Sequence, residues 1–198
     1  MTLPNKLTLG RLFLTPVYFA VFYVFLLKNI QPVVGIILLW LIFIVVEITD
    51  VLDGYVARKY NLVSDVGKLM DPFADVIARV TYFLCFYSIG IMPLWALVVI
   101  IWREYFIMFI RMLIAKEGTA LAASIWGKAK AVTYFISGIL AHVAITLNIF
   151  WESYAFKDII NVALYLLFAL SAVSALFSFL SYLINYMKTE THKKFMRE

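Results

Sequence analysis

Residues 33–51 read VVGIILLWLIFIVVEITDV, an apolar run whose only charges, Glu47 and Asp50, lie near its end. An α-helix crosses the hydrocarbon core of a bilayer in about 20 predominantly apolar residues. The run therefore has the length and character of a transmembrane helix. Similar runs lie on both sides of it, and together they predict six membrane spans, at residues 12–27, 33–51, 72–89, 93–110, 131–151 and 159–186.

The composition of the 198 residues supports this interpretation, because 65% are hydrophobic and 15% are charged. Soluble domains are roughly half apolar and one quarter charged. We therefore expect an all-α polytopic membrane protein, a single domain over residues 1–198, with a short amphipathic segment at residues 1–9. The net charge of +5 does not indicate nucleic-acid binding, since the basic residues are scattered between apolar runs.

The distribution of basic residues predicts the orientation of the chain. With six spans, both termini and the connections after the second and fourth spans lie on one side of the membrane. Lys28 and Lys157 are the only basic residues expected on the other side, which leaves 15 of the 17 on or near the first side. The positive-inside rule makes that first side cytosolic.

Four aspartates flank the connection between the second and third spans. Asp50 and Asp53 are three residues apart, and Asp71 and Asp75 are four apart, so each pair shares one face of its helix. Acids at a bilayer edge are costly unless paired or metal-bound, which makes them candidates for function. Four clustered carboxylates require cations, and Mg²⁺ or Mn²⁺ prefers such oxygen ligands. Two such ions could clamp a diphosphate during an in-line displacement.

Residues near these aspartates favour a phosphate ligand. Gly54 and Gly67 allow the backbone to come close to a ligand, and Arg58 can neutralise phosphate. The structural alternative is that the aspartates are solvated residues paired with Arg58, Lys59 and Lys68. Two spaced acidic pairs together with two glycines and an arginine make that alternative weaker.

The full pattern, Asp50-x2-Asp53-Gly54-x2-Ala57-Arg58-x8-Gly67-x3-Asp71-x3-Asp75, resembles the signature of the CDP-alcohol phosphatidyltransferases. The six-span layout resembles that family over nearly the whole chain. The resemblance implies a metal-dependent membrane enzyme in which the hydroxyl of an acceptor alcohol attacks the lipid-side phosphate of CDP-diacylglycerol and CMP leaves.

The same resemblance implies roles for the individual residues. Two Mg²⁺ or Mn²⁺ ions would be ligated by Asp50, Asp53, Asp71 and Asp75. Asp75 would also accept the proton of the alcohol. Contacts to the nucleotide and diphosphate would come from Gly54, Ala57, Arg58 and Gly67. The implied partners are CDP-diacylglycerol, a small polar alcohol and the bilayer.

Three further segments resemble the bacterial branch of the family that uses glycerol 3-phosphate, the phosphatidylglycerophosphate synthases. They are Pro4-Asn5-x-Leu7-Thr8-x2-Arg11, Arg103-Glu104-x6-Arg111 and Gly127-Lys128-x-Lys130. This implies the inner (cytoplasmic) membrane, with the active site on the cytosolic side. It also implies that Arg103, Arg111 and Lys128 bind the acceptor. For Arg103, the structural alternative is an ion pair with Glu104 or another acid, or snorkelling to the interface.

Val76 departs from this branch, in which a lysine commonly follows the last aspartate. Other acceptors therefore stay open, namely serine, inositol phosphate, choline or another lipid's headgroup. A divalent-cation transporter is a more distant alternative, but it would place acids near the bilayer midplane or around a pore. A homodimer is also possible. It could use the stripe of small residues at Ser171, Ser174, Ala175, Ser178 and Ser181, although packing within the bundle is favoured.

Overall fold

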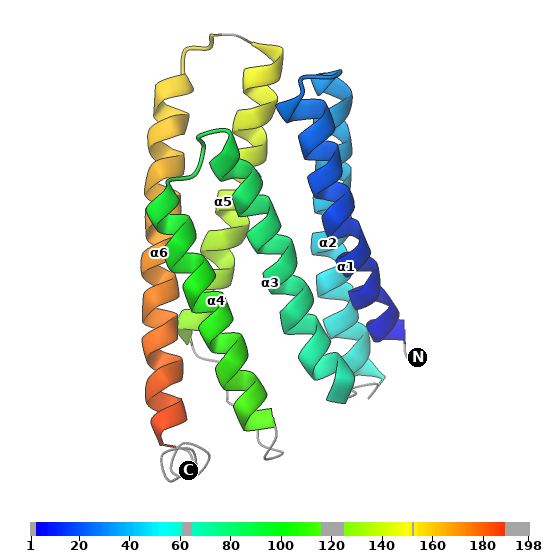
Figure 1. Ribbon diagram of the computed structural model, residues 1–198, viewed down its shortest axis with the longest axis vertical. Coiled ribbons are helices and arrows are strands. Elements are labelled where there is room, and N and C mark those ends of the chain that lie inside the picture. The colour runs from blue at the N-terminus through cyan, green and yellow to red at the C-terminus, as the bar shows by residue number, and fades with distance from the viewer. Residues whose placement is uncertain (1–2, 61–64, 116–124, 152, 189–198) are drawn as a thin grey trace.

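The computed structural model describes residues 3–60, 65–115, 125–151 and 153–188. These residues form a bundle of long helices and contain no strand (Figure 1). The helices are α1 (Leu3–Val21), α2 (Pro32–Lys59), α3 (Asp65–Ser88), α4 (Leu94–Ala115), α5 (Ile125–Phe150) and α6 (Lys157–Met187). A π-helical segment, η1 (Phe22–Leu27), extends α1. The predicted all-α fold is confirmed.

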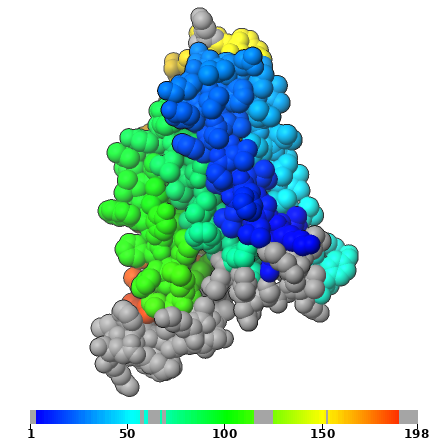
Figure 2. Space-filling model, turned by 45° about the vertical axis from the view of Figure 1, so that its right-hand side comes forward, coloured from blue at the N-terminus to red at the C-terminus, as the bar shows by residue number. Residues whose placement is uncertain are grey.

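The helices pack as two groups of three. In one group α1 packs on α2 and α3, and in the other α6 packs on α4 and α5 (Figure 1). Contacts of α5 with α2 and α3, and of α3 with α4, join the groups. In Figure 2 α1 runs along one face of the molecule. The start of α1, the end of α2 and the start of α3 lie at the same end of the bundle.

The helices present apolar side chains outward, as a membrane protein requires. Phe13, Ile37 and Leu166, for example, are 60% or more exposed. Four stretches are long and apolar enough to cross a membrane, namely Pro4–Leu27, Pro32–Val56, Ile125–Phe150 and Lys157–Met187. In α4, which is not among them, Arg103 and Glu104 are each only 5% exposed. Arg103 and Glu104 therefore face the interior of the bundle. The count of six membrane spans stays a prediction.

The N-terminal segment differs from the expectation. Residues 1–9 were expected to form a separate amphipathic segment, but the helix is continuous from Leu3 into the first predicted span. Thr8 is fully buried and Arg11 is 2% exposed. The polar face of this segment turns into the bundle because acidic partners on α2 and α3 lie there.

At the end of the bundle opposite the aspartates, one glycine allows a turn and another allows a close helix contact. Gly90 has φ +77° in the turn between α3 and α4, a conformation that disfavours most side chains. This turn falls between the two spans expected at residues 72–89 and 93–110. A Cβ atom at Gly35 would collide with the side chain of Phe25, so this glycine allows α2 to lie against η1.

Several polar side chains between the helices form hydrogen bonds within the bundle. His142 is fully buried, and its ring nitrogens lie 3.0 Å from the Tyr18 hydroxyl and 2.8 Å from the Gly138 carbonyl oxygen. On α6, Ser171 hydrogen-bonds Ser137 of α5 at 3.1 Å. Most of the predicted small-residue stripe is buried, namely Ser171, Ser174, Ala175 and Ser178. These residues pack within the bundle, as the sequence favoured.

Candidate active site

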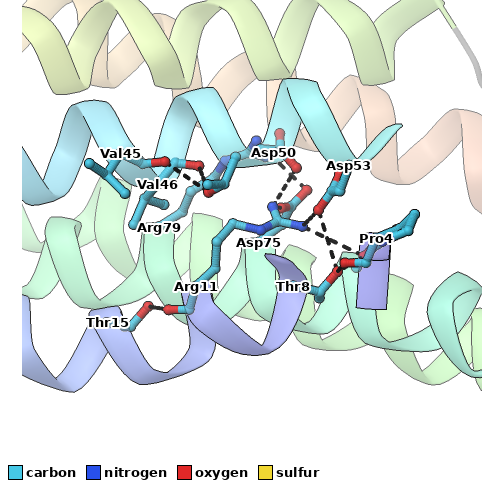
Figure 3. Close-up of polar contacts among 12 residues, drawn as sticks. Pro4, Thr8, Arg11, Thr15, Val45, Val46, Asp50, Asp53, Asp75 and Arg79 are labelled. Atoms are coloured by element: carbon cyan, nitrogen blue, oxygen red, sulfur yellow. Dashed lines mark hydrogen bonds and ion pairs between the residues drawn. The ribbon is translucent and has the colours of Figure 1, made fainter. Parts of the chain in front are cut away.

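The four aspartates come together from two helices. Asp50 and Asp53 lie on α2, and Asp71 and Asp75 lie on α3. Arg11 of α1 contacts all four carboxylates, so their side chains point towards one space between α1, α2 and α3 (Figure 3). The spacings of three and four residues thus place each pair on one helix face, as expected.

Arg11 lies at the centre of this cluster. Its Nη1 contacts Asp50 and lies 2.6 Å from an Asp75 oxygen, while Nη2 lies 2.6 Å from Asp53 and 3.6 Å from Asp71. The arginine side chain is 1% exposed and Asp53 is 2% exposed, whereas Asp71 is 40% exposed. One guanidinium among four carboxylates leaves a formal charge of about −3 when all are ionised.

Thr8 adds a second contact from α1. Its hydroxyl lies 2.5 Å from an Asp71 oxygen, 3.1 Å from the Pro4 carbonyl oxygen and 3.4 Å from Asp53. A hydroxyl has one proton to donate, and the short distance favours donation to Asp71. Thr8 and Arg11 are three residues apart, so both project from the same face of α1.

Thr8 and Arg11 were quoted in the N-terminal motif but were not identified as site residues. They lie about 40 residues before Asp50 in the sequence, and only the packing of α1 on α2 and α3 brings them to it. A usable signal was present, because an arginine at the start of an apolar span is costly without an acidic partner.

The donor set fits divalent cations in its chemistry and its charge. Carboxylate oxygens are the ligands that Mg²⁺ and Mn²⁺ prefer, and the cluster retains a negative excess after Arg11 is counted. Among the described residues, no three carboxylate, imidazole or thiol side chains form a ready coordination shell. Arg11 instead lies between the carboxylates and holds them in proximity.

The predicted nucleotide contacts flank the cluster along the helices. Gly54 follows Asp53 on α2 and is half-buried, and Gly67 is buried near the start of α3. Ala57 and Arg58 belong to α2, but their side chains lie outside the described part of the structure. Their roles therefore stay predictions.

A polar pocket of about 350 Å³ opens beside the aspartates, lined by residues of α2, α3, α4, α5 and α6. Its charged lining residues are Asp50, Asp75, Arg79, Arg103, Glu104, Arg111, Lys128 and Lys130. The three residues predicted to bind the acceptor thus share one pocket with Asp75. Val76, the departure noted in the sequence, also lines this pocket and is buried.

Buried ion pairs neutralise part of this pocket. Glu104 lies 2.8 Å from Arg103 and 2.7 Å from Lys130, and all three residues are 7% exposed or less. Arg103 also donates to the Ser178 hydroxyl of α6 at 2.7 Å. The structural alternative for Arg103, a pair with Glu104, is therefore present. Sequence analysis did not identify Glu104 and Lys130 as site residues.

The other cations of the pocket have a different environment. Arg111 donates to the Tyr182 hydroxyl at 3.0 Å, and its guanidinium lies 5.5 Å from the ring centroid of that tyrosine. Tyr182 is uncharged, so this contact does not neutralise the charge of the arginine. Lys128, at the start of α5, is exposed. Both residues can therefore attract an anion into the pocket.

A second groove, of about 560 Å³, lies between α2 and α5. Its lining is mostly apolar and includes Ile48, Val51, Leu52, Val132 and Phe135. Its polar lining residues are Glu47, Asp50 and Arg79. The groove and the polar pocket therefore meet at the aspartate cluster.

Comparison with known proteins found similar sequences. The profile of the CDP-alcohol phosphatidyltransferase family matches residues 1–173. A CDP-diacylglycerol–glycerol-3-phosphate 3-phosphatidyltransferase of Treponema pallidum is 40% identical over 141 residues, 68% of this chain and 65% of the relative. The Bacillus subtilis protein of the same name is 35% identical over 152 residues, 71% of this chain and 77% of the relative. A probable phosphatidylglycerophosphate synthase of Mycobacterium tuberculosis is 34% identical over 126 residues, 63% of this chain and 57% of the relative. The chain thus spans less than two thirds of the Treponema and Mycobacterium relatives.

Proposed function

Because the chain belongs to the CDP-alcohol phosphatidyltransferase family, we propose that it transfers the phosphatidyl group of CDP-diacylglycerol to sn-glycerol 3-phosphate. The products are phosphatidylglycerophosphate and CMP. One observation carries the choice of acceptor: Arg111 and Lys128 share a pocket with Asp75. An anionic acceptor held by these cations has its hydroxyl next to a carboxylate. The relatives named for glycerol 3-phosphate support the same choice.

In the proposed reaction, the acceptor's phosphate lies against Arg111 and Lys128, and its hydroxyl lies beside Asp75. Asp75 accepts the hydroxyl proton while the acceptor oxygen forms a bond to the lipid-side phosphorus. The bond between that phosphorus and the CMP oxygen breaks, and CMP leaves with the electron pair. Holding both reactants in line supplies much of the rate enhancement.

The family is generally dependent on divalent cations, and we propose that two Mg²⁺ or Mn²⁺ ions bind Asp50, Asp53, Asp71 and Asp75. When bound, such ions would neutralise the diphosphate and the leaving CMP oxygen. Carboxylate oxygens from two helices supply the required donors. Arg11 balances part of their charge within the bundle.

The apolar groove between α2 and α5 suits the lipid substrate. Its walls match acyl chains, and its polar end at Asp50 lies where the diphosphate is required. Gly54, Ala57, Arg58 and Gly67 are proposed to contact the nucleotide. The expected location is the inner (cytoplasmic) membrane with the site on the cytosolic side, where a soluble acceptor and CMP can exchange.

An acceptor screen tests this function. The purified full chain, in vesicles containing CDP-diacylglycerol with Mn²⁺ or Mg²⁺, is given glycerol 3-phosphate, serine, inositol phosphate or choline in separate reactions. We expect CMP release and phosphatidylglycerophosphate with glycerol 3-phosphate, and loss of both in an Asp75→Asn control. Release with a different alcohol would overturn the acceptor, and no release with any of them would contradict the transferase activity.

A further inference from the structure

Arg79 lies where the two openings of the site meet. Three residues line both the polar pocket and the apolar groove, namely Asp50, Arg79 and Ala131. Arg79 is the positively charged one among them. A reaction that joins a polar acceptor to a lipid must take place where the acceptor and the lipid meet, so the proposed function would place this arginine beside the reacting atoms.

The guanidinium of Arg79 is less tightly ion-paired than the charged groups of Arg11 and Lys130. Its nearest ion pair in the described residues joins Nη2 to Asp75 at 3.9 Å, and 22% of its side chain is exposed (Figure 3). Arg11 reaches Asp75 at 2.6 Å, and Lys130 reaches Glu104 at 2.7 Å. The Arg79 guanidinium therefore has room and donors for a ligand oxygen.

The position of Arg79 along α3 relates it to Asp75. The two residues are four apart on one helix face. Val76, which follows Asp75, contributes an apolar side chain to the pocket wall. The positive charge on this part of α3 is that of Arg79, one helical turn after Val76. A guanidinium there can reach a phosphate whose attacking alcohol is next to Asp75.

On these grounds, and resting on the proposed transfer, we infer that Arg79 is a catalytic residue that binds a non-bridging oxygen of the phosphate being transferred. As the acceptor oxygen bonds to phosphorus and the CMP oxygen departs, negative charge on the non-bridging oxygens must be stabilised. A guanidinium can donate a charged hydrogen bond to one of these oxygens, and it keeps its charge throughout. Arg79 itself exchanges no proton.

Arg79→Gln and Arg79→Lys test this role in the purified full chain. Loss of one such donor typically lowers kcat by about 10²–10³-fold. We expect a loss of this size in Arg79→Gln, with little change in the KM for glycerol 3-phosphate. Lys28→Gln is the matched control, because this exposed lysine lies at the opposite end of the bundle, over the Tyr23 ring. It should retain wild-type kinetics.

A stereochemical measurement separates contact from structural support. CDP-diacylglycerol is prepared as its two diastereomers with sulfur in place of one non-bridging oxygen on the lipid-side phosphate. If Arg79 binds one of these oxygens, the ratio of wild-type to Arg79→Gln kcat/KM should differ about tenfold or more between the diastereomers, the size of one weakened charge-assisted contact. The same ratio for both would overturn the inference.

Two further outcomes are decisive. A loss confined to the KM of glycerol 3-phosphate would overturn the inference in favour of acceptor binding. If Arg79→Gln does not yield folded protein, Arg79→Lys takes its place in the diastereomer comparison, and an unchanged ratio again overturns the role.

Failure of the proposed function is a separate result, because it appears in the wild type as no CMP release with glycerol 3-phosphate. The Arg79 comparison then uses whichever alcohol releases CMP.

Discussion

At the aspartate cluster, one buried arginine balances part of the charge of four carboxylates. Arg11 lies within 2.6 Å of Asp53 and Asp75 and also contacts Asp50. Carboxylates this close repel one another unless cations lie among them. Arg11 therefore stabilises the bundle when no other cation is bound. A divalent ion bound by the same carboxylates would also reduce their mutual repulsion.

This argument predicts a metal-dependent stability for Arg11→Gln. In EDTA the variant should lose about 1–3 kcal/mol of unfolding free energy. This loss is smaller than the ~3–5 kcal/mol expected when one partner of a fully buried ion pair is removed, because Asp50 and Asp75 are about 30% exposed. In Mn²⁺ the difference from wild type should shrink, as measured by thermal unfolding in detergent. Arg11→Lys, which keeps the charge, is the control. An equal loss in EDTA and Mn²⁺ would contradict the idea.

The acceptor side of the site gives a second prediction at this scale. Arg111→Ala or Lys128→Ala removes a charge-assisted contact to the acceptor phosphate, typically about 1.5–3 kcal/mol. The KM for glycerol 3-phosphate should rise roughly 10- to 150-fold, while the KM for CDP-diacylglycerol changes much less. Steady-state kinetics with each substrate varied in turn would measure both. Equal rises for the two substrates would mean that these residues support the fold instead.

At the scale of elements, one acid links the helices that form the polar pocket. Glu104 of α4 forms ion pairs with Lys130 of α5, at 2.7 Å, and with its neighbour Arg103. Arg103 in turn donates a hydrogen bond to the Ser178 hydroxyl of α6 at 2.7 Å. The contacts tie α4, α5 and α6 together beside the pocket. Replacing one member of such a buried set leaves the other charges without a partner. The resulting loss of stability exceeds the net stabilisation that the intact set provides.

A double-mutant cycle would measure this coupling. Glu104→Gln should destabilise the protein by about 3–5 kcal/mol, because two buried cations lose their partner. Lys130→Met in the same chain should recover part of that loss, with a coupling of about 1–3 kcal/mol by detergent unfolding. Lys128→Met, at an exposed position two residues away, should change stability little. Additive effects of the first two substitutions would show that the ion pair contributes no coupling.

At the scale of the whole molecule, the placement of α3 and α4 decides the topology. Four stretches have the length and apolar character of membrane spans. Neither α3 nor α4 is among them, and α4 carries two buried charges, Arg103 and Glu104. If both also cross, the turn at Gly90 lies on the same side of the membrane as Gln31 and Ser153. If neither crosses, that turn stays on the side of Lys59.

Cysteine labelling distinguishes these topologies. In a Cys85→Ala background, Ile89→Cys should react with an impermeant thiol reagent only from the side that labels Gln31→Cys and Ser153→Cys. Lys59→Cys should react only from the other side. The native cysteine is 2% exposed, so replacing it removes background without opening the surface. Labelling of position 89 from the side of Lys59 would contradict six spans.

The sequence by itself determined the class of fold and the aspartate pairs. Apolar runs long enough to cross a bilayer require helices, because backbone groups in lipid must be hydrogen-bonded within their own segment. The intervals between Asp50 and Asp53, and between Asp71 and Asp75, place each pair on one face through helical periodicity alone. These are local properties, set by residues close together in the chain.

Only the tertiary structure decided which residues from other helices meet the aspartates. Arg11 and Thr8 reach them because α1 packs between α2 and α3 as one continuous helix. Glu104 forms a buried ion pair with Arg103, one of the acceptor candidates, and two cavities meet at Arg79. Such contacts depend on how whole helices cross and which faces they bury, and side-chain packing over long sequence distances sets both.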